Sequence, residues 1–253
     1  MSQPAAPASY WRATRAPRHS LLFALPLLLL YELLAFALSR SQLSAVRNGA
    51  DVLLKSVFVA LGGRYGLTAF SVLLLCAGAA LVWRDRRRNG AIRPRLFVGM
   101  LAESLLYAAL LGGVASALTT LLLHGRLALV AAGAADPSAL AGLGLPTQLM
   151  VSLGAGIYEE LLFRVLLVSG LAALGRLVFR WNPAASGIFA AIVGALLFSL
   201  FHYVGPLGDE FTLGSFTFRA IAGLLFSALY LLRGFGIAAW SHALYDVFLS
   251  LAA

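Results

Sequence analysis

The sequence predicts an all-α polytopic membrane protein, a transmembrane helix bundle of about seven spans with its functional core in the carboxyl-terminal four. Of the 253 residues, 61% are hydrophobic and only 11% are charged, and the mean hydropathy is +0.90. Soluble domains are about 45–50% apolar and about 25% charged. Apolar runs long enough to cross a bilayer also recur along the chain. These observations exclude a soluble globule, a disordered chain and a disulfide-rich secreted domain.

A transmembrane helix needs about 20 mostly apolar residues, and seven segments come close to this length. They are residues 21–38, 66–83, 97–123, 148–174, 186–204, 216–232 and 236–253. The third and fourth are long, so we expect them to tilt. The first follows Arg12, Arg15 and Arg18, as a signal peptide would. However, it exceeds the about 7–15 residues of a signal sequence and contains Glu32, so we interpret it as a retained anchor.

The segments around these spans indicate the domain organisation. Residues 1–20 are expected to form a flexible cytoplasmic tail, and residues 21–147 to form the amino-terminal transmembrane helices. Within the latter, an amphipathic stretch near residues 43–61 is expected to lie in the membrane interface. Residues 128–144, rich in Ala, Gly and Leu, predict an outer loop or a short re-entrant helix. Residues 148–253 are then the core.

Arginine dominates the net charge of +9, because every one of the 19 basic residues except Lys55 is Arg. Most of them lie between the apolar runs, which is typical of topology signals and of contacts with anionic lipids rather than of nucleic-acid binding. With seven spans, the Arg-rich segments fall on one side, so the positive-inside rule predicts a cytoplasmic amino terminus and an outer carboxyl terminus. The Arg-rich, nearly Lys-free composition suggests a GC-rich bacterial genome and hence the bacterial inner membrane.

Titratable side chains also occur inside the predicted spans, where each central charge costs roughly 2.5–3.5 kcal/mol. They are Glu32, Glu103, Glu159, Glu160, His202, His242 and Asp246. A chain that tolerates such costs uses these groups or pairs them. The lone Cys76 allows neither an intramolecular disulfide nor a thiolate cluster for a metal.

The fourth span contains Glu159, Glu160 and Arg164. Glu160 and Arg164 are four residues apart and share one face of an α-helix, so the simplest interpretation is a buried ion pair. Glu159 lies about 100° further round an α-helix and is expected to face a different neighbour. The functional interpretation is that a desolvated carboxylate at this position serves as a general base.

The fifth span contains Phe198 and His202, and the seventh contains His242 and Asp246 four residues apart on one face. In the simplest interpretation His202 is an interfacial residue and Asp246 orients His242. In the functional interpretation both His face a reaction centre shared with the glutamates. His202 falls near the outer end of its span and His242 near the inner end, so a shared site requires shifted span limits or strong tilts.

These residues, in this order and inside spans, resemble the three motifs of the CAAX protease and bacteriocin-processing (CPBP) family. The motifs are Glu159-Glu160-x-x-x-Arg164, Phe198-x-x-x-His202 and His242-x-x-x-Asp246. The family comprises intramembrane endopeptidases related to the CAAX prenyl endopeptidase, and the resemblance covers residues 148–253.

The resemblance implies a division of roles among the motif residues. Glu159 would activate the attacking water with support from Glu160. His202 would position that water. His242 with Asp246 would stabilise the tetrahedral oxyanion, which needs a donor in a low-dielectric site.

Three further residues are assigned supporting roles by the resemblance, namely Arg164, Phe198 and Arg219. Asp246 departs from the family pattern, which often has Asn at this position. An Asn amide donates a hydrogen bond to an oxyanion, whereas Asp does so only when protonated.

A metal-dependent version of the same site is the alternative mechanism. Its zinc ligands would be Glu159, Glu160, His202 and His242, because two His plus carboxylates suit zinc and a zinc-bound water is activated. The sequence contains no His-Glu-x-x-His helix. We therefore favour a glutamic mechanism without a metal or other cofactor.

The predicted function is hydrolysis of a peptide bond near the carboxyl terminus of a membrane-associated protein or peptide. Bacteria generally lack prenylated CAAX proteins, and bacterial relatives are linked to peptide maturation, bacteriocin self-immunity or removal of carboxyl-terminal sorting tails. One alternative is a non-catalytic immunity or scaffold protein, against which the complete motifs speak. Another is a proton-coupled transporter, against which the absence of inverted repeats speaks.

Overall fold

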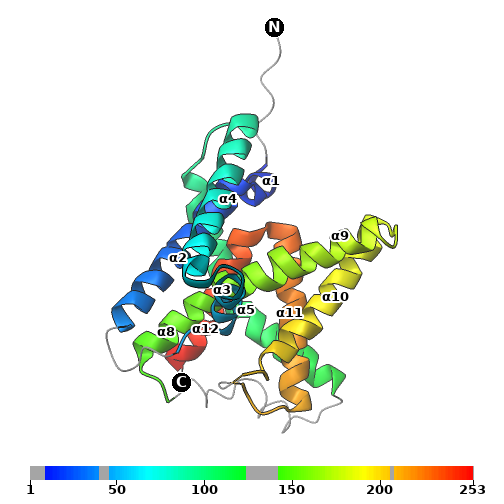
Figure 1. The fold of residues 1–253 in the computed structure, drawn as a ribbon. Coiled ribbons are helices and arrows are strands. Elements are labelled where there is room, and N and C mark those ends of the chain that lie inside the picture. Colours follow the sequence, from blue (N-terminus) through cyan, green and yellow to red (C-terminus); the bar gives the residue numbers. More distant parts are fainter. Residues whose placement is uncertain (1–8, 40–45, 124–141, 206–207, 253) are drawn as a thin grey trace.

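The computed structural model describes residues 9–39, 46–123, 142–205 and 208–252, which form a bundle of helices (Figure 1). Every regular element among these residues is helical. Six of the helical segments are long and apolar enough to cross a bilayer. The prediction of an all-α polytopic membrane protein is therefore confirmed. Most of the predicted outer loop or re-entrant helix, residues 128–141, lies outside the described residues.

The helices follow the predicted spans closely. In chain order they are α1 (Tyr10–Arg15), α2 (Pro17–Leu38), α3 (Gly49–Gly62), η1 (Gly63–Tyr65), α4 (Gly66–Asn89), α5 (Arg95–Leu122), α8 (Leu145–Gly154), η2 (Ala155–Val168), α9 (Ser169–Leu177), α10 (Pro183–Phe201), α11 (Leu213–Arg233) and α12 (Phe235–Ala252). The six membrane-crossing candidates include α3 to α4 as one stretch. The predicted fourth span corresponds to α8, η2 and α9, which follow one another without a break.

The expectation of a flexible tail over residues 1–20 is wrong for its described part, because α1 and the first turn of α2 lie there. Arg233, at the end of α11, is 1% exposed and forms an ion pair with Glu103 of α5. The Arg233 guanidinium lies 3.9 Å from the centroid of the Trp11 ring. Tyr10 donates a 2.9 Å hydrogen bond to Glu103. Tyr10 and Trp11 therefore fasten α1 to the buried ion pair that joins α5 and α11.

α12 is the central helix and packs against α2, α5, α8, η2 and α11. Its buried face is rich in small residues such as Ala239 and Ala243. On η2, a Cβ atom at Gly156 would lie 2.4 Å from the Ala239 carbonyl oxygen and 2.6 Å from the Ala243 Cβ. Glycine at this position therefore allows the close approach of η2 and α12. Helices from both predicted parts of the chain, residues 21–147 and 148–253, pack on α12 and share one core.

Two of the acidic residues in the predicted spans are paired outside the motif cluster. Glu103 is paired with Arg233. Glu32 accepts hydrogen bonds from Lys55 at 3.0 Å and from the Tyr158 hydroxyl at 2.6 Å. Of the five acidic residues in the predicted spans, the three in the motifs therefore remain as candidates for catalysis, namely Glu159, Glu160 and Asp246.

Candidate active site

η2 carries both glutamates, and its winding sets their relative direction. It is π-helical, with hydrogen bonds between residues five apart, and such segments are rare and frequent at functional sites. A π-helix has more residues per turn than an α-helix, so Glu159 and Glu160 diverge by less than the α-helical angle. Both reach His242: Glu159 Oε2 is 3.9 Å from its Nε2, and Glu160 Oε1 is 2.8 Å from its Nδ1. Glu159 also accepts a hydrogen bond from Asn48, whereas Arg164 pairs with Glu160, so Glu159 has a partner other than Arg164, as expected.

Glu160 orients His242 from a buried ion pair. Its Oε1 lies 3.2 Å from Nη1 of Arg164, and the two side chains are 0% and 1% exposed. Arg164 in turn lies over the Phe198 ring, 4.4 Å from its centroid. Glu160 Oε1 accepts a hydrogen bond from Nδ1 of His242, which fixes the orientation of the imidazole. Phe226 stacks on the imidazole at 4.3 Å and holds its plane.

Asp246 lies one turn beyond His242 on α12, with Oδ2 3.7 Å from Nε2 of that imidazole. Nε2 thus faces both Asp246 and Glu159, while Nδ1 is held by Glu160. Side-chain exposure is 0% for Glu160, 5% for His242, 9% for Glu159 and 28% for Asp246. Of these four side chains, Asp246 is the most exposed.

His202 joins the cluster from the carboxyl end of α10. Its Nδ1 donates to the Phe198 carbonyl at 2.9 Å, which leaves Nε2 as the free ring nitrogen. The His202 ring packs edge-on against Phe198, with centroids 4.8 Å apart. Phe198 and His242 have ring centroids 6.0 Å apart. The last turn of α10 and the second turn of α12 therefore lie at one level, which removes the difference in depth inferred from the span limits.

Arg219 lies at the edge of the cluster. It forms an ion pair with Asp209 and donates a 2.8 Å hydrogen bond to Ser215. Its charge also acts on His202 and Asp246. The structure therefore places Arg219 beside the cluster, where it influences the charges of the motif residues from outside.

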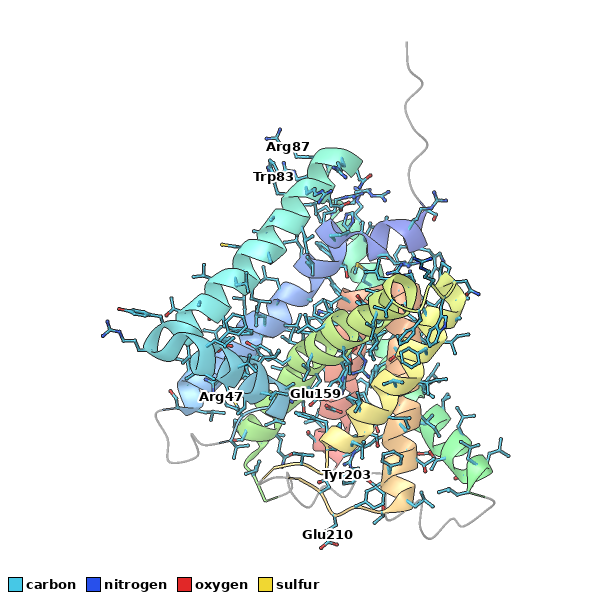
Figure 2. The ribbon with its side chains drawn as sticks, turned by 45° about the vertical axis from the view of Figure 1, so that its right-hand side comes forward. Arg47, Trp83, Arg87, Glu159, Tyr203 and Glu210 are labelled. Atoms are coloured by element: carbon cyan, nitrogen blue, oxygen red, sulfur yellow. The ribbon has the colours of Figure 1, made fainter. Side chains whose placement is uncertain are left out.

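Asn48, at the amino end of α3, contacts the cluster and was missed by the sequence reasoning. Its Nδ2 donates a 2.7 Å hydrogen bond to Glu159 Oε1. Figure 2 shows Glu159 beside the chain near Arg47, which precedes Asn48. An Asn before a helix is a recognisable amino-terminal cap, but that pattern does not indicate which side chain the amide meets across the bundle.

A separate apolar groove of about 1260 Å³ lies on another face of η2. From η2 it is lined by Ile157, Leu161 and Val165, and it extends along α2, α4 and α9. Neither the two motif glutamates nor the motif histidines line it. The size of this groove is therefore no guide to the position of the acid and imidazole groups.

The four proposed zinc ligands do not form a ligand set. Across the described ranges, no three His, Cys, Asp or Glu side chains are arranged so that they could hold a metal ion. Glu160 Oε1 accepts a hydrogen bond from Nδ1 of His242 and forms an ion pair with Arg164, so this oxygen is already engaged. The arrangement instead suits proton transfer between carboxylate and imidazole groups.

The part of the chain that contains this cluster is similar to a known protein family. The family model described as Type II CAAX prenyl endopeptidase Rce1-like matches residues 141–248. This match supports a protease family of the CAAX type for the matched region. The Rce1-like region contains all three motifs, from Glu159 to Asp246, and corresponds to a CAAX-type intramembrane protease. No curated protein and no solved structure matches the chain.

Proposed function

We propose that this protein is a glutamic intramembrane endopeptidase in which Glu159 activates the attacking water. The observation that carries the proposal is the pairing of Glu159 Oε2 with His242 Nε2 across 3.9 Å. Oε2 is buried and accepts no hydrogen bond from any of the described residues. A polar separation of more than 3.5 Å suits a water molecule between the two atoms.

The proposed reaction uses Glu159 twice. It takes a proton from the water as the water oxygen bonds to the scissile carbonyl carbon. When the tetrahedral intermediate collapses, the C–N bond breaks and the same carboxyl returns the proton to the leaving amine. Positioned proton transfer of this kind contributes about 10²- to 10⁴-fold to the rate.

The oxyanion is proposed to form next to His242. Because Nδ1 donates to Glu160, the imidazolium form carries its second proton on Nε2, which faces Glu159 and Asp246. That N–H donates to the oxyanion in a site largely shielded from water. Removal of one such donor costs about 10²- to 10³-fold in kcat. His202, with Nε2 free, is proposed to position the water against Glu159.

We propose that the reaction proceeds without zinc, because Glu160 is bonded to His242 and Arg164, and no three His, Cys, Asp or Glu side chains among the described residues are arranged for a metal ion. The expected result is that 1,10-phenanthroline leaves the cleavage rate of purified protein unchanged and that added zinc does not raise it. Loss of activity with the chelator, restored by zinc, would replace this mechanism with the metal-dependent one.

The scissile bond is proposed to enter from the face opposite the Arg-rich ends. Tyr203 and Glu210 lie at the end of the molecule opposite Trp83 and Arg87 (Figure 2). Asp246, the most exposed of the four acidic and imidazole side chains compared above, lies toward the carboxyl end of α12. With the Arg-rich end in the cytoplasm of a bacterial cell, the substrate is the carboxyl-terminal part of a membrane-associated protein or peptide on the outer side.

The experiment that tests the proposal compares the membrane proteomes of wild-type and Glu159→Gln cells. We expect at least one protein to keep its carboxyl-terminal segment only in the variant, because Gln is isosteric with Glu and cannot take a proton from water. The variant should accumulate in the membrane to the wild-type level. Identical processed termini in both strains would favour the non-catalytic scaffold instead.

A further inference from the structure

The amino end of α3 forms part of the wall around Glu159. Asn48 is 3% exposed, and its Oδ1 accepts hydrogen bonds from the backbone N–H groups of Ala50 at 2.9 Å and Asp51 at 3.4 Å. Its Nδ2 donates to Glu159 Oε1 at 2.7 Å. The opposite amide orientation would put oxygen against the carboxylate and NH₂ against N–H groups. The helix cap therefore determines which atom Asn48 presents to Glu159.

α3 is itself held in place by a buried carboxylate. Asp51 is 0% exposed, accepts from the Tyr31 hydroxyl at 2.7 Å and from Arg47 at 3.0 Å, and forms an ion pair with Lys55 at 2.7 Å. Buried hydrogen bonds and ion pairs of this kind rigidify their surroundings. The first turn of α3 is thereby tied to α2.

The fit between α3 and the helix that carries Glu159 is also close. A Cβ atom at Gly154, the last residue of α8, would lie 2.7 Å from the Asn48 Cβ and 2.6 Å from the Tyr31 ring. Asn48 therefore approaches the backbone one helical turn before Glu159, a distance that only glycine allows. The amide and the carboxylate are held together from both sides.

We propose that Asn48 is a positioning residue for the hydrolysis proposed above, on which this inference rests. By occupying Oε1, it directs Oε2 of Glu159 toward His242 and the attacking water. A donor to a carboxylate also favours the ionised form, which is the form that acts as a base. An amino-terminal helix outside the family match thus supplies a part of the active site.

Besides Asn48, charged and titratable side chains from three helices surround Glu159. They come from its own helix (Glu160, Arg164), from α10 (His202) and from α12 (His242, Asp246). A substitution at Asn48 leaves all of them in place. In a variant that adds no charge, such as Asn48→Ser, a change in the pH profile therefore reports on the bond from Asn48 to Glu159.

The decisive variant is Asn48→Asp, tested with full-length protein in nanodiscs. Asp caps a helix as well as Asn does, so α3 keeps its cap while Glu159 loses its donor and gains a like charge. We expect kcat to fall more than tenfold with KM within about twofold. The acid limb of the kcat profile should move to higher pH, because Glu159 ionises less readily. The probe is a quenched fluorescent peptide spanning the junction found in the Glu159→Gln proteome comparison.

The matched control is Asn182→Asp. Asn182 caps α10 in the same way, accepting from the Ala185 N–H at 2.8 Å, and it is exposed and has no bond to the cluster. We expect it to keep the wild-type kcat and pH profile. Asn48→Ser, which also caps but is too short to reach Glu159, should lower kcat without introducing a charge. If Asn48→Asp fails to insert into the membrane, Asn48→Ser still tests whether the bond to Glu159 matters for kcat.

The outcomes separate this inference from the proposed function. Wild-type kcat and pH profile in both Asn48 variants, together with an inactive Glu159→Gln, would overturn the positioning role and leave the peptidase intact. An active Glu159→Gln would overturn the role of Glu159 as the general base, and with it the positioning role of Asn48. A fall in kcat that is matched by Asn182→Asp would show a general effect of capping and would also overturn the positioning role.

Discussion

Gly156→Ala should separate the glutamates from His242 without touching any motif residue. The added Cβ would lie 2.4 Å from the Ala239 carbonyl oxygen, and ordinary contact begins at 3.4 Å, so η2 and α12 must move apart by about 1 Å. The Glu160–His242 hydrogen bond of 2.8 Å would then lengthen to about 3.8 Å, beyond hydrogen-bond range. A misplacement of about 1 Å costs about 10²-fold in rate, and overpacking of this kind costs about 1–3 kcal/mol of stability.

The assay measures peptide cleavage by purified protein in nanodiscs, alongside the midpoint of thermal unfolding. Gly170→Ala on α9 is the matched control, because a Cβ there meets nothing within 4 Å. It should keep wild-type activity and gain slightly in stability, since Ala favours a helix more than Gly does. A folded Gly156→Ala protein with wild-type kcat would refute the argument that close approach of η2 and α12 assembles the site.

Two further predictions concern the charges of the cluster. Arg164→Met should lower the free energy of unfolding by about 3–5 kcal/mol, because Glu160 stays buried without its cation. Adding Glu160→Gln should restore part of that loss in chemical denaturation, and no recovery would argue against the ion pair. Asp246→Asn should keep at least about a tenth of the wild-type kcat, since an amide can donate to the oxyanion, whereas Asp246→Leu should lose about 10²-fold or more. Wild-type activity of both variants would remove Asp246 from the mechanism.

Much of the fold could be predicted from the sequence, because membrane insertion depends on local composition. The spans are readable as apolar runs, and their boundaries coincide with local signals such as Asn182 before Pro183 and Gly234 at positive φ. The motif residues were also identifiable, because a titratable group inside an apolar run costs free energy that must be recovered by use or pairing. The cytoplasmic amino terminus and the substrate stay predictions.

The sequence by itself therefore determined the class of protein, the helices and which acid and imidazole groups are unusual. Only the tertiary structure decided which of them meet. In the π-helical η2, both Glu159 and Glu160 approach His242, a contact that the sequence does not indicate. Asn48 reaches Glu159 across 111 residues of sequence because α3 packs on η2. The membrane spans follow from the transfer free energies of local segments. Contacts between side chains far apart in the sequence depend on how whole helices pack.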